Sequence, residues 1–198
     1  YKNNMTANEL SKAKVEPSEE GDKLSFYDEE MDAPYGFDLL KGSSYDKTKE
    51  SELFVVLGSS FNATERAALC DYLEKNATQT LVAVRSTEGV EDIKTMNSRD
   101  YVEKLPAFQS FLTDNLLGWF CENYKIDPKK ICITGYETAG FSAGYALYNG
   151  NSTAEYLMIN PEMNKKKENK DMAKTDEEYS SAGNTSLSAN VCVVRAEE

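Results

Sequence analysis

From residue 53 onward the sequence alternates between short apolar runs and segments whose apolar residues recur at helical spacing. Runs of this length, rich in branched aliphatic residues, are typical of strands buried on both faces. Alternating strands and helices place helices between parallel strands, so we predict an α/β fold with a mostly parallel central sheet and helices on both faces. The predicted strands are Leu53–Leu57, Leu81–Val84, Ile131–Ile133, Tyr156–Ile159 and Val191–Val194.

The segment before residue 53 divides into a leader and two further short strands. Residues 1–22 are polar, dominated by Asn, Lys and Glu, and we predict a loosely ordered leader there. Lys23–Tyr27 alternates apolar and polar residues like an edge strand, and Tyr35–Leu40 is a second candidate. At 198 residues in total, the chain has room for one domain, which we place at residues 23–198.

Two helices are predicted between the central strands. Asn62 followed three residues later by Glu65 resembles a capping box, and Leu69, Cys70 and Leu73 give that helix an inward face. The second helix runs from Leu105 to Tyr124, with apolar positions at Phe108, Leu112, Leu116 and Trp119. Ile126–Pro128 breaks it, because proline cannot continue a helix.

Charge and hydropathy exclude two classes of partner. The net charge of −12, from 34 acidic and 22 basic residues, repels phosphate backbones, so no nucleic-acid partner is expected. No run approaches the ~20 apolar residues that a membrane helix needs, and we expect a soluble protein without a membrane span. The oligomeric state is left open.

The sequence contains no histidine, which removes the commonest general base and the commonest metal ligand. A Ser-His-Asp triad cannot be assembled from these residues alone. The four cysteines have no C-x-x-C spacing, and we therefore expect no metal and no cofactor. Cys132 and Cys192 fall in strand-like apolar runs, which predicts buried free thiols.

The stretch from Ile131 to Tyr148, ICITGYETAGFSAGYALY, is typical of a buried strand, a glycine-rich turn and a helix. A nucleophile elbow needs this order, with one side chain exposed on the turn. Glu137 holds that position, whereas the literal G-x-S-x-G centred on Ser142 comes five residues later. Five helical residues rotate a side chain by ~500° and advance it by ~7.5 Å, so Ser142 would point away from the elbow.

The elbow stretch resembles that of the esterase family that includes the enterochelin and ferric-siderophore esterases. In that family the corresponding pattern is G-x-S-x-G-G-x-S-A-L-Y. The resemblance covers about residues 50–198 and is most specific from 105 to 163. It implies an α/β-hydrolase fold, with Glu137 at the family's nucleophilic serine and Ser142 at its second, structural serine. Further similar segments are Leu53–Phe61, Ser98–Tyr101, Phe108–Pro128 and Tyr156–Met163.

The resemblance also implies where the remaining site residues would lie. The oxyanion donors would come from Thr138 and from the loop at Gly58 and Ser59. The family's acid and histidine follow the last strand seen here, so Glu197 stands about where the acid would appear. A C-terminal part of the fold, with a histidine, could lie beyond residue 198. The ligand implied is a small-molecule ester or a siderophore-like compound.

Three functional hypotheses follow. A glutamate at the elbow would stay ionised at a helix N-terminus and would occupy the oxyanion donors, and without a base it could not clear an intermediate. The leading hypothesis is therefore a catalytically degenerate esterase-like domain, a pseudoenzyme that keeps a binding role. The alternatives are an active serine esterase using Ser142 with a histidine beyond residue 198, and a non-enzymatic interaction module. The family is best known in bacteria, and an exported or cell-envelope location is favoured over the cytoplasm.

Overall fold

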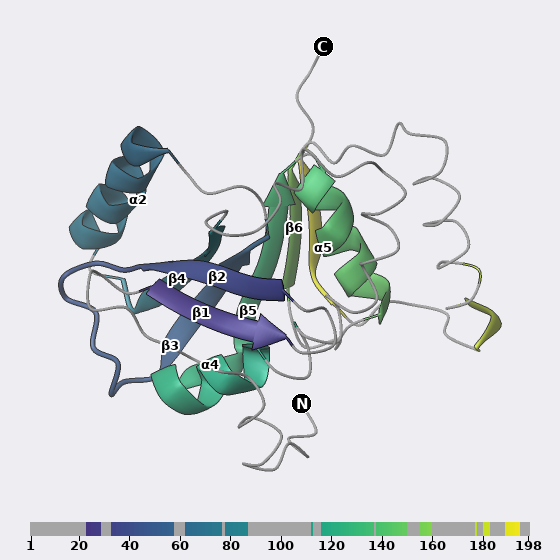
Figure 1. Ribbon diagram of the computed structural model, residues 1–198, viewed down its shortest axis with the longest axis horizontal. Helices are drawn as coiled ribbons and strands as arrows, with labels where there is room; N and C mark the ends of the chain where they lie inside the picture. The colour runs from purple at the N-terminus through teal and green to yellow at the C-terminus, as the bar shows by residue number, and fades with distance from the viewer. Residues whose placement is uncertain are drawn as a thin grey trace.

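The computed structural model describes residues 23–28, 33–57, 62–76, 78–86, 112, 116–136, 138–149, 155–159, 177, 180–182 and 189–194. Seven strands form one sheet in the order β1-β2-β4-β3-β5-β6-β7 (Figure 1). The strands are β1 (Lys23–Asp28), β2 (Ala33–Leu40), β3 (Ser51–Val56), β4 (Thr80–Ser86), β5 (Ile126–Tyr136), β6 (Glu155–Ile159) and β7 (Val191–Val194). The predicted leader, residues 1–22, lies outside the described residues.

The sheet is mostly parallel, as predicted. Strands β4, β3, β5, β6 and β7 pair in parallel in that order. Only the β1–β2 and β2–β4 pairings are antiparallel within the described sheet. All the predicted strands are present, with the two short N-terminal segments pairing as a hairpin at one end.

Helices cover both faces of the sheet, which confirms the predicted α/β architecture. They are α2 (Ala63–Lys75), α4 (Leu117–Tyr124) and α5 (Thr138–Asn149). Because successive strand residues point to opposite faces, the buried side chains divide into two clusters. The larger cluster holds residues of α4 and α5, and the smaller holds Leu73 of α2.

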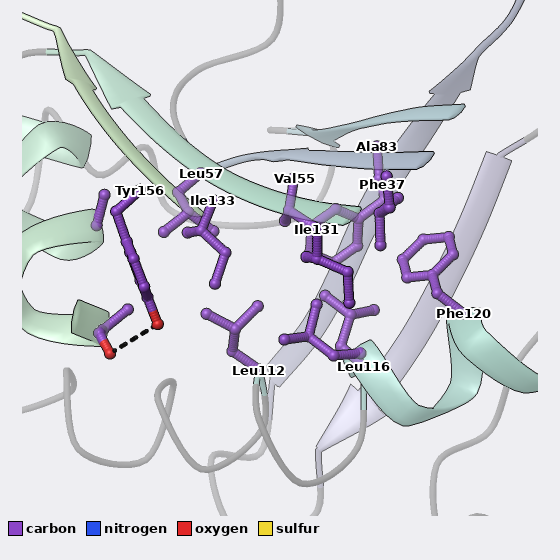
Figure 2. Close-up of a cluster of buried hydrophobic side chains, with 14 of the residues drawn as sticks. Phe37, Val55, Leu57, Ala83, Leu112, Leu116, Phe120, Ile131, Ile133 and Tyr156 are labelled. Carbon is purple, nitrogen blue, oxygen red and sulfur yellow. Dashed lines mark hydrogen bonds between the residues drawn. The ribbon is translucent and has the colours of Figure 1, made fainter. Parts of the chain in front are cut away.

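The larger cluster forms the main core. Leu53 and Val55 of β3 point into it together with Ile131 and Ile133 of β5, and all four are fully buried or nearly so. Figure 2 shows Leu112 and Leu116 facing Ile131 and Ile133 of β5. Leu112 and Leu116 are buried as predicted, and Trp119 packs against the cluster but is only half-buried. Phe108 and the predicted start of the helix at Leu105 lie outside the described residues.

The smaller cluster attaches α2 to the opposite face, where Leu73 packs near Val82 and Val84. The predicted capping box is present: the Glu65 backbone N–H donates to Asn62 Oδ1 at 2.9 Å, and the Asn62 N–H donates to Glu65 Oε2 at 2.8 Å. Leu73 is buried, whereas Leu69 and Cys70 are half-buried.

A buried acid joins the same helix to β2. Asp38 is only 5% exposed, and the Arg66 guanidinium of α2 donates to its Oδ2. A buried carboxylate is costly without such a partner. This ion pair therefore helps to fix where α2 lies on the sheet.

The chain leaves α4 through Lys125, whose φ of 50° is left-handed and ends the helix. Strand β5 begins at once at Ile126, five residues before the predicted start. Ser51 pairs with Ile126 and Leu53 with Ile131, so the register shifts between them. The extra β5 residues include Pro128, which lies within the irregular stretch. A proline inside a sheet is tolerated at such a place. The predicted break is confirmed, and the strand is longer than predicted.

The cysteine prediction is right for Cys132 and wrong for Cys192. Both are free thiols, but Cys132 is buried and Cys192 is exposed. Cys192 lies on β7, the last strand in the sheet order, where all four residues are exposed. An apolar run predicts a strand, but it cannot tell whether that strand lies inside the sheet or at its end.

We expect iodoacetamide at pH 8 to alkylate Cys192 at least about tenfold faster than Cys132 in the folded protein. The thiolate is the reactive form, and burial, with the nearby Glu155 charge, raises the pKa of Cys132 to about 11. Peptide mapping over time would give both rates. In urea the two rates should converge, and equal rates in the folded protein would contradict the assigned burial.

Across the part of the chain that the structure describes, every helix is too short or too polar to cross a bilayer.

Candidate functional site

The carboxyl ends of β3 and β5 lie side by side at one edge of the sheet. The two strands are parallel neighbours, with Val56 in register with Thr134. The Leu57 backbone N–H donates to the Thr134 carbonyl at 2.9 Å, which keeps the strands joined to their ends. In parallel α/β sheets, ligands collect at this edge.

The turn from β5 into α5 is very tight. The strand ends at Tyr136 and the helix starts at Thr138, so a single residue separates them. A Cβ placed on Gly135 would lie 2.0 Å from the Ala139 carbonyl oxygen and 2.3 Å from its carbonyl carbon. The first helical turn therefore packs directly on the strand backbone, which only glycine at position 135 permits. A nucleophile elbow has this geometry.

Small residues let α5 lie close to the sheet. Ala139, Ala143 and Ala146 are all buried in the main core. From β6, the Tyr156 hydroxyl donates to the Ala146 carbonyl at 3.3 Å, seen as the dashed line in Figure 2. With the helix held in this way, its N-terminus lies at the carboxyl end of β5. The free N–H groups and the dipole of that terminus favour a negative charge there.

A polar network occupies the opposite, amino edge. Gln79 Nε2 donates to Ser51 Oγ at 3.0 Å, and the Asp46 backbone N–H donates to Gln79 Oε1 at 3.2 Å. Lys130 and Glu50 approach each other within 3.6 Å near the starts of β5 and β3. These polar groups bond to one another, so this edge serves to hold loops together.

Most of the predicted site residues lie outside the described residues. This applies to Glu137, Gly58, Ser59 and Glu197. Of the others, Thr138 is the first residue of α5, and the Ser142 backbone lies inside that helix. The described backbone thus ends β5 at Tyr136 and begins α5 at Thr138, while the roles assigned to the predicted site residues stay predictions.

Sequence reasoning missed Tyr136. This last residue of β5 is 54% exposed, although it follows four buried strand residues and a buried glycine. Its position directly before the elbow residue was the available signal. Among the described residues, no three Cys, Asp or Glu side chains gather closely enough to hold a metal ion.

No protein-family model matches the sequence, and no curated protein sequence matches it. Solved structures do match. Siderophore hydrolase EstB from Aspergillus nidulans is 10% identical, with a TM-score of 0.64, over 92% of this chain and 70% of that one. BES protein from Bacillus cereus is 14% identical, with a TM-score of 0.62, over 93% and 74%. Siderophore hydrolase EstA from Aspergillus nidulans is 11% identical, with a TM-score of 0.57, over 87% and 67%.

At these identities the likeness concerns the fold. The chain has the α/β-hydrolase fold that the elbow stretch and the alternating pattern indicate, and the similar structures include esterases. The match covers between 67% and 74% of the length of these three solved chains, so each of them extends beyond the matched part.

Proposed function

We propose that this chain is an esterase-like domain that binds a small-molecule ester or siderophore-like ligand at the carboxyl ends of β3 and β5 and does not hydrolyse it. The α/β-hydrolase fold supports a site at that edge. The names of similar structures support the ligand class, since two are siderophore hydrolases and another is a ferulic acid esterase in complex with ferulic acid.

The proposal rests on two observations: β5 ends at Tyr136 only two residues before α5 begins at Thr138, and the sequence, which has glutamate at the predicted nucleophile position 137, contains no histidine. Acyl transfer by a serine needs a base to remove the hydroxyl proton and an oxyanion site free of charge. A glutamate in place of the serine has no hydroxyl to take up the acyl group, and its negative charge opposes a developing oxyanion. A neutral ligand can still bind at such an edge through apolar contacts and hydrogen bonds.

A second candidate, a non-enzymatic interaction module, is favoured by β7. Val191, Val193 and Val194 are among the most exposed large apolar residues of the described chain. Apolar side chains on both sides of a terminal strand are typical of a surface that another element covers. This reading requires no ligand at the elbow edge.

The test combines turnover with binding. We expect p-nitrophenyl acetate to be hydrolysed no faster by the natural protein than by Glu137→Ala. We also expect saturable binding of methyl benzoate in ligand-observed NMR titrations. Glu137→Ala should change that affinity, whereas Glu50→Ala, at the amino edge, should not. A fluorophosphonate probe should leave Ser142 unlabelled in peptide maps.

Turnover that disappears in Glu137→Ala but survives in Glu50→Ala would overturn the non-hydrolytic assignment. Labelling of Ser142 would favour the active serine esterase instead. Absence of any ester binding by a folded protein would favour the interaction module.

A further inference from the structure

Tyr136 presents an exposed aromatic ring at the edge where the candidate site lies. It is the last residue of β5 and is separated from α5 by one residue. With 54% of its surface exposed, it differs from Phe37 and Tyr156, which are buried, and from Phe54 of β3, which is half-buried. A tyrosine ring in this place adds a flat apolar surface to the rim of the site.

The neighbouring strands continue this surface. Tyr136 is in register with Ile159 of β6, which is in register with Val194 of β7. Residues in register on adjacent strands share a face of the sheet. Ile159 is half-buried and Val194 is exposed. The row Tyr136–Ile159–Val194 is therefore an apolar strip along the carboxyl ends of β5, β6 and β7.

Charge limits what this strip can accept. The chain carries a net charge of −12, and none of the three strip residues is charged. An anionic ligand would be repelled by the molecule as a whole and would find no cation in the strip. An uncharged group with a flat face fits both the ring and the two aliphatic neighbours.

We propose that Tyr136 is a specificity-determining residue whose ring packs against a flat aromatic group of an uncharged ester ligand. This inference rests on the proposed function, the binding of a small ester at the same edge. It adds a preference for aromatic over saturated ring systems, because ring–ring contacts are more favourable than burial of equal apolar area alone.

The test compares methyl benzoate with methyl cyclohexanecarboxylate, two uncharged esters that differ in ring flatness. The natural protein should bind methyl benzoate about three- to tenfold more tightly in ligand-observed NMR titrations, a ratio set by the ring contact. Tyr136→Leu should bring the ratio to about one. Tyr136→Phe should keep the preference, because the ring remains. Tyr72→Leu is the matched control, since Tyr72 of α2 is 60% exposed but belongs to another element.

The outcomes separate the two proposals. A preference for methyl benzoate that survives Tyr136→Leu, or is absent from the natural protein while both esters bind, overturns the role of Tyr136 and leaves the proposed function standing. If neither ester binds the folded protein, the proposed function fails and the role of Tyr136 fails with it. Loss of the preference in Tyr72→Leu as well would also count against Tyr136.

Discussion

Replacing Gly135 with alanine is expected to lower the free energy of unfolding by at least about 3 kcal/mol, the upper range for overpacking a buried site. The added Cβ would meet the Ala139 carbonyl oxygen at 2.0 Å, its carbonyl carbon at 2.3 Å and the Gly140 nitrogen at 2.7 Å. All three are backbone atoms, so no side-chain rotation can relieve the overlap. The first turn of α5 would have to move off the end of β5.

Gly42→Ala provides the control, because Gly42 also lies against a helix backbone. There the added Cβ would lie 3.1 Å from the Leu73 carbonyl group, which requires a shift of only a few tenths of an ångström. Urea unfolding followed by far-ultraviolet circular dichroism would give both free energies. Equal and small losses in the two variants would show that α5 does not begin in contact with β5.

The contrast between these glycines shows what the sequence can and cannot predict. The order of strand, glycine and helix predicts a tight turn, and the structure confirms its place. The same letters do not show that Gly135 is held by backbone contact. That constraint comes from how closely α5 approaches the sheet, which depends on the buried alanines along the helix.

Other differences arise where a residue's environment is set by distant parts of the chain. Asp38 interrupts an otherwise apolar strand, and only its pairing with Arg66, 28 residues away, accounts for its burial. Cys192 has the local sequence of a buried strand residue but is exposed because β7 ends the sheet. By contrast, Asn62 and Glu65 are close in sequence, and the local pattern is enough to predict the helix cap that they form.

The candidate site also has features that local sequence predicts and features that it does not. The turn between Tyr136 and Thr138 follows from hydrophobic periodicity and glycine placement, which are local. The exposure of Tyr136 depends on what covers the end of β5, which no short pattern encodes. The assigned roles of Glu137, Gly58, Ser59, Thr138, Ser142 and Glu197 remain predictions that chemistry must test.

Truncating Tyr156 to alanine is expected to cost about 3–5 kcal/mol of unfolding free energy, as for other large buried aromatic residues. Tyr156 is 2% exposed and fills the space between β6 and α5 (Figure 2). The Ala146 carbonyl lies in the last turn of α5, which ends at Asn149. The Tyr156 hydroxyl donates to this carbonyl at 3.3 Å and so links β6 to the end of the helix.

Tyr156→Phe isolates the hydrogen bond from the packing. It keeps the ring but leaves the Ala146 carbonyl without this donor, so we expect a loss of about 1–2 kcal/mol. Urea unfolding of both variants at pH 7 would give the two values. A loss for Tyr156→Phe as large as that for Tyr156→Ala would contradict the assignment of most of the stabilisation to the buried ring.

The natural protein and Tyr156→Phe should also differ in how their stability changes at alkaline pH. Burial raises the pKa of Tyr156 from 10.0 to about 12, so the folded state favours the neutral phenol. A group whose folded pKa is raised stabilises the fold below its unfolded pKa and loses that contribution as pH rises through the folded value. The stability advantage of the natural protein over Tyr156→Phe should therefore shrink between pH 10 and pH 12. A stability advantage that stays constant over this range would mean that the phenol of Tyr156 is not buried between β6 and α5. Other contacts would then have to account for how α5 is held against β6.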